Sequence, residues 1–280
     1  MITSLNDPQE ISYGTRIVEN EISRLIEQDG VKEKDFLTML RSQVRMFSGR
    51  LVDTWISCFC ETGDLLSQWR AYGDLGGGYA LKFNFSDATR MIAMQELKDS
   101  DLSTKPEPTL APVLRKVIYD RDEQTRMAAD FIHQSVQAVE SARKGSINSL
   151  HPQERMGFDA WLAADAANYL FDLILSFKDS AFKEEQEWRL IRVLPDTEKA
   201  EQIEFREVGP RLVPYRPTCL FDQANEPVTL PLSEITLGPT LDPAEAGPAI
   251  SVLLRHEESR IHPIKVLGYA NVRSSTARLR

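Results

Sequence analysis

Apolar residues recur at helical spacing through the first two-thirds of the chain. In residues 9–28 they lie three, four and seven positions apart, which is the pattern of an amphipathic helix with one buried face. Asp29-Gly30 interrupts that pattern, and a second run of the same kind covers residues 32–47. Longer runs cover residues 121–143 and 152–178. We therefore expect four main helices, and shorter ones over residues 65–72, 86–97 and 243–256.

Short stretches rich in aromatic and β-branched residues predict strands. Residues 53–60 are the clearest candidate for a buried strand, and residues 79–83 and 115–119 follow the same pattern. Beyond Pro195 the chain becomes rich in such stretches. Strands are expected there over residues 202–208, 211–215, 228–230, 234–237 and 263–267.

Helices thus dominate the first two-thirds of the chain and strands the last third. No internal repeat and no low-complexity linker interrupts residues 1–280. This order predicts an α+β fold, with a mixed or antiparallel sheet core flanked by helices in a single domain over residues 1–280.

Composition narrows the class of protein. The chain has 280 residues, of which 42% are hydrophobic, enough to bury a sizeable core. Its net charge of −9 disfavours a general nucleic-acid binder that reads phosphates with a basic surface. The chain has neither a signal-peptide pattern at its start nor a run of about 18 apolar residues, so we expect a soluble, cytoplasmic protein with no membrane partner.

The metal-ligating residue types are sparse. Cys58 and Cys60 lie two apart without a second ligand pair, and with Cys219 they are expected to be buried free thiols. The four histidines are scattered without ligand spacing, which disfavours a metal site or a histidine triad.

Residues 181–193 (AFKEEQEWRLIRV) are the first candidate for chemistry. They predict an acidic helix end followed by a strand that opens at Glu187, with Glu187 and Arg189 on one face and Trp188 on the other. Glu185 joins Glu187 on that face if the extended run begins two residues earlier. Two carboxylates that close would differ in pKa. The alternative is a solvated charge run that closes a helix before an ordinary amphipathic strand.

The second candidate is the segment DLLSQWRAYG at residues 64–73. Asp64 is predicted to cap the N-terminus of its helix, and Gly73 to end it. Trp69 and Arg70 offer a ring to stack on and a guanidinium for a phosphate, which suits a planar phosphorylated ligand. The equally weighted alternative puts Trp69 in the core and pairs Arg70 with an acid such as Glu187.

Two further patterns have simpler interpretations. The triplet Gly76-Gly77-Gly78 has neither the Walker spacing nor the dinucleotide fingerprint and precedes a strand, so a hinge or hairpin connection is favoured over a phosphate loop. The apolar stripe of the helix over residues 152–178 is expected to pack in the core. This stripe consists of Phe158, Trp161, Leu162, Ala166, Tyr169, Leu170, Leu173 and Ile174.

Spaced motifs along nearly the whole chain resemble those of a bacterial family of unknown function, some members of which belong to abortive phage-infection systems. The motifs are LNDP at residues 5–8, SCF at 57–59, LSQWRAYG at 66–73, GYALKF at 78–83, FKEEQEWRL at 182–190 and ITLGP at 235–239.

The order of these motifs more distantly resembles the ADP-ribosyltransferase fold, in which a catalytic glutamate opens a late strand. That resemblance implies that Glu187 is the catalytic glutamate and that Glu185 is its partner in a paired-glutamate motif. It places Ser57, Ser67, Gln68, Trp69 and Arg70 near a cleft for NAD, the substrate, with no metal required. Arg70 or Arg189 would hold the pyrophosphate.

The implied chemistry is coherent. Cleavage of the nicotinamide–ribose bond builds positive charge on the ribose, which a fixed carboxylate stabilises. Members of the family usually begin with a strand bearing a His-Tyr-Thr-like motif, whereas this chain starts at the Leu5-Asn6-Asp7 segment. We therefore expect an N-terminally truncated fold whose cleft lacks one wall. Either the sequence is cut short at this end or the protein has lost NAD binding, and whether the chain is catalytically active stays open.

The leading hypothesis is thus an NAD-dependent ADP-ribosyltransferase-like protein, a phage-defence or toxin component whose acceptor, protein or nucleic acid, stays open. The alternative is a non-catalytic protein-interaction module, an antitoxin or sensor of a bacterial defence system. A metal-dependent nuclease using Asp64, Glu185 and Glu187 ranks last, because three acids are easily found by chance among 42.

Overall fold

The chain divides into two compact units. Unit 1 comprises Met1–Ile56 and Arg115–Glu184, and unit 2 comprises Ser57–Leu114 and Glu185–Arg280. A single domain with two lobes and a pair of separate domains would both divide in this way. The single domain expected over residues 1–280 therefore stays a prediction. The computed structural model describes residues 9–49, 54–84, 92–95, 113–145, 151–193, 204–208, 210–215, 219–221, 227–228, 232–260 and 271–278.

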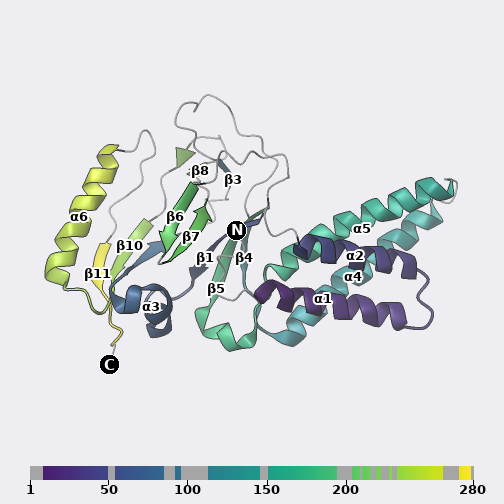
Figure 1. The fold of residues 1–280 in the computed structure, drawn as a ribbon, viewed down its shortest axis with the longest axis horizontal. Helices are drawn as coiled ribbons and strands as arrows, with labels where there is room; N and C mark the ends of the chain where they lie inside the picture. The colour runs from purple at the N-terminus through teal and green to yellow at the C-terminus, as the bar shows by residue number, and fades with distance from the viewer. Residues whose placement is uncertain are drawn as a thin grey trace. The chain divides into compact units, whose positions relative to one another are not determined.

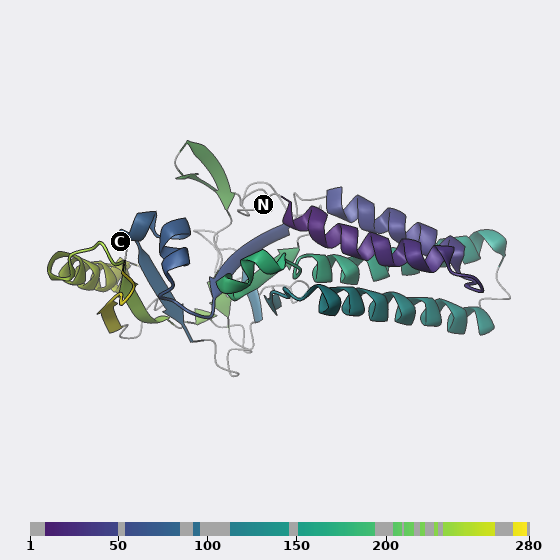
Figure 2. The same cartoon turned by 90° about the horizontal axis from the view of Figure 1, so that it is seen from below.

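Unit 1 contains the four main helices that were expected from the sequence. Its helices α1 (Glu10–Glu27), α2 (Lys34–Gly49), α4 (Arg121–Lys144) and α5 (Pro152–Ile174) run alongside one another in both views (Figures 1 and 2). Each contributes fully buried apolar side chains to a common core. Among these are Val18, Ile22, Phe36, Leu40, Ile132, Leu170 and Ile174.

A glycine lets two of these helices approach closely. A Cβ atom on Gly14 of α1 would lie 2.9 Å from the carbonyl oxygen of Ile174 at the end of α5. That separation is shorter than normal packing allows, so a larger residue would push the helices apart.

The end of α5 is held by buried polar groups. The helix stops at Ile174, earlier than the predicted 178, because the next residues bond to the chain before α4: Lys178 N–H donates to Ile118 O at 3.2 Å. Gln124 of α4 donates to Lys178 O at 2.9 Å. The buried Lys178 ammonium pairs with Glu10 at 3.0 Å. Buried charges are tolerated here because they are paired.

Unit 2 contains small sheets, and the division between units passes through two of its strands, β1 and β4. Strands β1 (Thr54–Cys60), β5 (Glu187–Val193) and β4 (Val113–Lys116) form one sheet in the order β1-β5-β4. Smaller pairings join β3 (Ile92–Gln95), β8 (Cys219–Phe221) and β9 (Pro227–Val228), and separately β6 (Glu204–Val208) and β7 (Arg211–Tyr215).

A mixed sheet and one helix share a hydrophobic core cluster in unit 2. Central strand β10 (Leu232–Leu237) pairs antiparallel with β2 (Tyr79–Phe83) and parallel with β11 (Asn271–Ser274). Helix α6 (Pro243–Arg260) packs on it through Ala246 and Ile250, which meet Ile235 and Leu237. The helix and β10 lie beside each other in Figure 1.

These elements confirm the α+β class and correct several boundaries. Strand β3 lies inside the predicted helix over residues 86–97, whose other residues lie outside those described, as does the predicted strand over 263–267. Strand β4 ends three residues before the predicted 119. Strand β1 is not the buried strand we expected, because only Thr54 within it is fully buried. Within the described residues, no helix combines the length and apolar character that a membrane span requires.

Candidate functional site

Glu187 opens strand β5 directly after a strained residue. Gln186 has φ 45°, a left-handed conformation uncommon for a non-glycine residue, and it follows the short helix η6 (Ser180–Glu185). Two contacts from the turn after β1 hold it: Glu61 N–H donates to Gln186 O at 3.1 Å, and Thr62 Oγ1 donates to Gln186 Oε1 at 3.1 Å. Glu185 therefore lies in the helix, and the extended run begins at Glu187.

The carboxylate of Glu187 is engaged by its neighbour on the same strand face. Arg189 Nε donates to Glu187 Oε1 at 2.8 Å, and Arg189 Nη2 donates to Oε2 at 3.2 Å. Both side chains are buried, with 5% of Glu187 and 1% of Arg189 exposed. The predicted alternation of faces is confirmed. The pairing also means that the predicted catalytic carboxylate meets an arginine of its own strand through both oxygens.

Cys60 of β1 lies close enough to Glu185 and Glu187 for their charges to affect the pKa of its thiol. Burial raises the pKa of the Cys60 thiol, and the negative charges of Glu185 and Glu187 raise it further. The thiol donates to Thr62 O at 3.2 Å. Cys58 and Ser57 on the same strand are exposed. Cys58 and Cys60 are free thiols, as predicted, but neither is fully buried; the side chain of Cys219 lies outside the described residues.

Helix α3 (Leu66–Tyr72) holds Trp69 in the core. Only 3% of Trp69 is exposed, and its indole N–H donates to Asp64 Oδ1 at 2.8 Å. This confirms the alternative interpretation of Trp69, in which its ring packs in the core. Arg70 is exposed and forms no ion pair with any residue that the structure describes, so the suggested pairing with Glu187 does not occur. Gln68 is half-buried, and the buried Ser67 Oγ has no hydrogen-bond partner among described residues.

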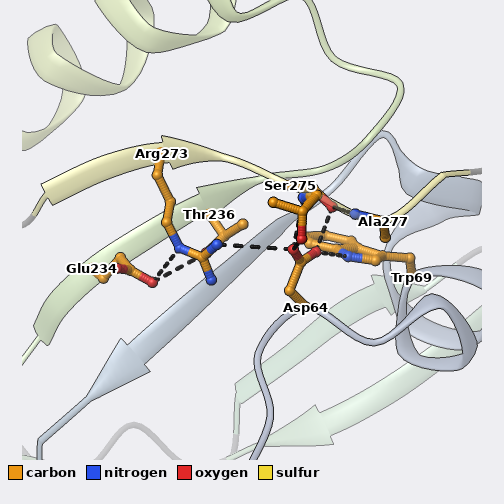
Figure 3. A network of polar contacts seen from close by, with 8 residues as sticks. Asp64, Trp69, Glu234, Thr236, Arg273, Ser275 and Ala277 are labelled. Atoms are coloured by element: carbon orange, nitrogen blue, oxygen red, sulfur yellow. Dashed lines mark hydrogen bonds and ion pairs between the residues drawn. The ribbon is translucent and has the colours of Figure 1, made fainter.

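Asp64 is not the cap of this helix, since Leu65 takes the N-cap position without a side-chain bond. Its carboxylate instead binds the segment after β11 (Figure 3). Oδ2 accepts from Thr276 N–H at 2.7 Å and from Thr276 Oγ1 at 2.9 Å, and Oδ1 accepts from Ser275 Oγ. Arg273 adds a 3.8 Å ion pair with Asp64 and a 2.6 Å contact with Glu234.

These contacts outweigh the effect of burial on the acid. Burial raises the pKa of Asp64, but hydrogen bonds from Ser275, Thr276 and Trp69 lower it from 3.8 to about 2. Asp64 is thus ionised at neutral pH and fastens α3 to the end of β11.

The glycine triplet forms a packed turn between α3 and β2. The N–H groups of Gly76 and Gly78 donate to Gly73 O at 2.8 Å, and that of Gly77 donates to Asp74 O at 3.1 Å. The turn is packed against the motif at residues 235–239: Gly238 N–H donates to Gly78 O at 2.9 Å. Because all three donors are used internally, they form no cradle for a phosphate.

The metal-dependent nuclease hypothesis requires a cluster of side chains that can bind a metal ion. Within the part of the chain that the structure describes, no three His, Cys, Asp or Glu side chains gather as metal ligands. Asp64, which that hypothesis requires, is committed to Ser275 and Thr276.

Helix α5 exposes aromatic side chains that the sequence interpretation assigned to the core. Trp161 is 61% exposed and Tyr169 56% exposed, whereas Ala166 and Leu170 are buried. The core assignment was therefore wrong for the two aromatic residues. The predicted stripe is wider than one helix face, since residues 161 and 166 lie about 140° apart around the axis. The width of the stripe in the sequence could have indicated that the helix has a second apolar face, which is exposed.

Comparison with known families gives one partial match. Residues 68–190, from α3 to β5, match the profile of a family described as a protein of unknown function (DUF2971). The matched range includes Trp69, Arg70, Glu185 and Glu187, and it confirms a resemblance to a family of unknown function over those residues. No curated protein and no solved structure matches the chain.

Proposed function

We propose that this protein is a non-catalytic interaction module that binds another polypeptide through the exposed aromatic face of α5. The observation that carries the proposal is the exposure of Trp161 and Tyr169 on one helix. Tryptophan and tyrosine are enriched at the centres of protein interfaces, where burial of their rings supplies much of the binding energy. Following the motif resemblance, the partner belongs to a bacterial defence system in which this chain acts as antitoxin or sensor.

The state of the candidate catalytic groups supports the same proposal. The Glu187 carboxylate binds Arg189, and the Trp69 ring is buried. The N–H groups of the glycine triplet donate to carbonyl groups of their own turn. Each group has a structural role that explains its presence without a substrate.

Purification of the tagged chain from its source cells tests the proposal. We expect a partner of fixed stoichiometry, measured by light scattering, that is lost from the double variant Trp161→Ala/Tyr169→Ala. The matched control is Met46→Ala, which removes an exposed apolar side chain from α2 in the same unit. Absence of a stoichiometric partner, or a partner retained by the double variant, would refute the proposal.

A second candidate is ADP-ribosyl transfer from NAD within an ADP-ribosyltransferase-like fold. The strained backbone at Gln186 favours it, because strain of this kind gathers at functional sites. Arg189 binds both oxygens of the Glu187 side chain, and a fixed carboxylate is the group that oxocarbenium stabilisation requires. In the reaction the C1′–nitrogen bond breaks, nicotinamide leaves with the bonding electrons, and an oxygen or nitrogen nucleophile of the acceptor bonds to C1′ and releases its proton.

Consumption and binding of NAD test the ADP-ribosyltransferase candidate. Labelled NAD should be consumed by the wild-type chain and by Met46→Ala but not by Glu187→Gln. Because the Glu187 substitution also disturbs a buried pair, Arg70→Ala is the second variant: its side chain is exposed, and it should weaken NAD binding without lowering the melting temperature. If NAD neither raises the melting temperature nor is cleaved, the candidate is refuted.

A further inference from the structure

Three exposed residues of α5 form a stripe. Trp161, Asp165 and Tyr169 follow one another at intervals of four positions, so each step rises about 6 Å along the helix and turns only about 40° around it. All three side chains are exposed. The stripe therefore presents two aromatic rings with a carboxylate between them.

Neighbouring rings support both aromatic members of the stripe. The Phe158 ring lies 5.9 Å from that of Trp161, with an angle of 38° between their planes. The Phe131 ring of α4 lies 5.5 Å from that of Tyr169, with an angle of 33°. These contacts restrict the exposed rings, so less conformational freedom is lost when a partner binds.

The charged member of the stripe is an aspartate. Asp165 forms no hydrogen bond or ion pair with the residues that the structure describes. Two arginines of unit 1 have acidic partners of their own: Arg126 lies 3.7 Å from Asp130 on α4, and Arg115 lies 3.8 Å from Asp172 on α5. The protein as a whole carries a net charge of −9. A cationic partner is attracted by this arrangement, and an anionic one is repelled.

We infer that the stripe binds an arginine-rich helical segment of the partner polypeptide. Arginine stacks on aromatic faces and forms two parallel bonds to a carboxylate, so one cation type satisfies all three members of the stripe. Arginines spaced four apart on the partner helix repeat the same distance of about 6 Å. This inference rests on the proposed interaction function and adds the chemistry of the partner.

The probe is a labelled helical peptide of about 20 residues with arginine at every fourth position along one face, compared with the same peptide carrying glutamine there. Fluorescence anisotropy should show the arginine peptide binding at least roughly tenfold more tightly than the glutamine peptide. Binding of both peptides with equal affinity, or of neither, would overturn the inference.

Charge-matched variants separate the stripe from the overall charge of the protein. Asp165→Asn and Asp35→Asn each remove one exposed negative charge from unit 1, but Asp35 lies in the first turn of α2. Asp165→Asn should weaken arginine-peptide binding by roughly fivefold and Trp161→Ala by roughly tenfold, whereas Asp35→Asn should change it less than twofold. Equal losses for the two aspartate variants would show non-specific attraction to an acidic protein and refute the stripe.

Two outcomes separate this inference from the proposed function. If the cellular partner depends on Trp161 but the arginine peptide does not displace it, the module stands and the partner chemistry is wrong. If light scattering shows a dimer of the pure chain that Trp161→Ala dissociates, a second copy covers the stripe and the inference falls.

Discussion

Replacing Asp64 with asparagine should destabilise unit 2 although it changes the side-chain shape little. The Thr276 N–H and hydroxyl both donate to Oδ2, and Trp69 and Ser275 donate to Oδ1. An asparagine has only one acceptor oxygen, so its NH₂ group would face the donors of Thr276 or those of Trp69 and Ser275. Hydrogen bonds to a charged group contribute about 1.5–3 kcal/mol each and neutral ones about 1, so we expect a loss of about 3 kcal/mol in the free energy of unfolding. Typical total stabilities are about 5–15 kcal/mol.

The same substitution should change the response to acid. The pKa of Asp64 is lowered from 3.8 to about 2 on folding, so its stabilising contribution is complete above the unfolded value and is lost as the pH falls from about 4 to 2. A shift of this size corresponds to about 2.4 kcal/mol, which solvent screening reduces to about 1–2 kcal/mol. Asparagine does not titrate, so the variant should lose that much less stability across this pH range than the wild type.

Native-state hydrogen exchange is the appropriate measurement, because two compact units can unfold in separate steps. Amides of β10 and β11 report unit 2, and amides of α2 serve as the internal reference for unit 1. Asp35→Asn is the matched control, since it makes the same chemical change on an exposed helix end. The reasoning would be refuted if the amides of β10 and β11 exchanged as slowly in Asp64→Asn as in the wild type, and if both proteins lost the same stability between pH 4 and 2.

Two further predictions concern buried close contacts. Glu187→Gln should cost about 3–5 kcal/mol in chemical denaturation because it removes one charge of the buried Glu187–Arg189 pair, whereas replacing both residues with methionine should be nearly neutral; the reverse order of stabilities would contradict this. Gly14→Ala should lower the thermal midpoint by several degrees because its Cβ meets Ile174 O, at a cost of about 1–3 kcal/mol. In contrast Gly157→Ala on α5, with no atom within 4 Å of the new methyl, should raise the midpoint, and equal effects of the two substitutions would show that the close approach is not limiting.

Local patterns were sufficient for the elements whose signals are local. The helical periodicity located α1, α2 and α4 within a few residues, and the boundaries of β7 (Arg211–Tyr215) were predicted without error. The alternation beginning at Glu187 correctly placed Arg189 on its face. In a strand, residues two apart share a face, so this pairing could have been anticipated from the sequence.

The errors arose where distant parts of the chain decide the outcome. Asp64 has the type and position of a helix cap, but its strongest partners lie more than 200 residues away at Ser275 and Thr276. The composition of β1 predicted a strand correctly, but burial depends on which neighbours cover it, and β1 lies at the end of its sheet. The exposure of Trp161 likewise follows from how many helices surround α5, which no short window of sequence reveals.

The order of strands in the β11-β10-β2 sheet has a consequence for synthesis of the protein on the ribosome. The sheet joins Tyr79–Phe83, Leu232–Leu237 and Asn271–Ser274, whereas the last segment of unit 1 ends at Glu184. The helices of unit 1 can therefore pack while β10 still waits for its parallel neighbour to emerge. A nascent chain stalled before residue 271 would carry β10 paired with β2 on one edge and unpaired on the other, and chaperone capture or proteolysis should act on the protein at that stage.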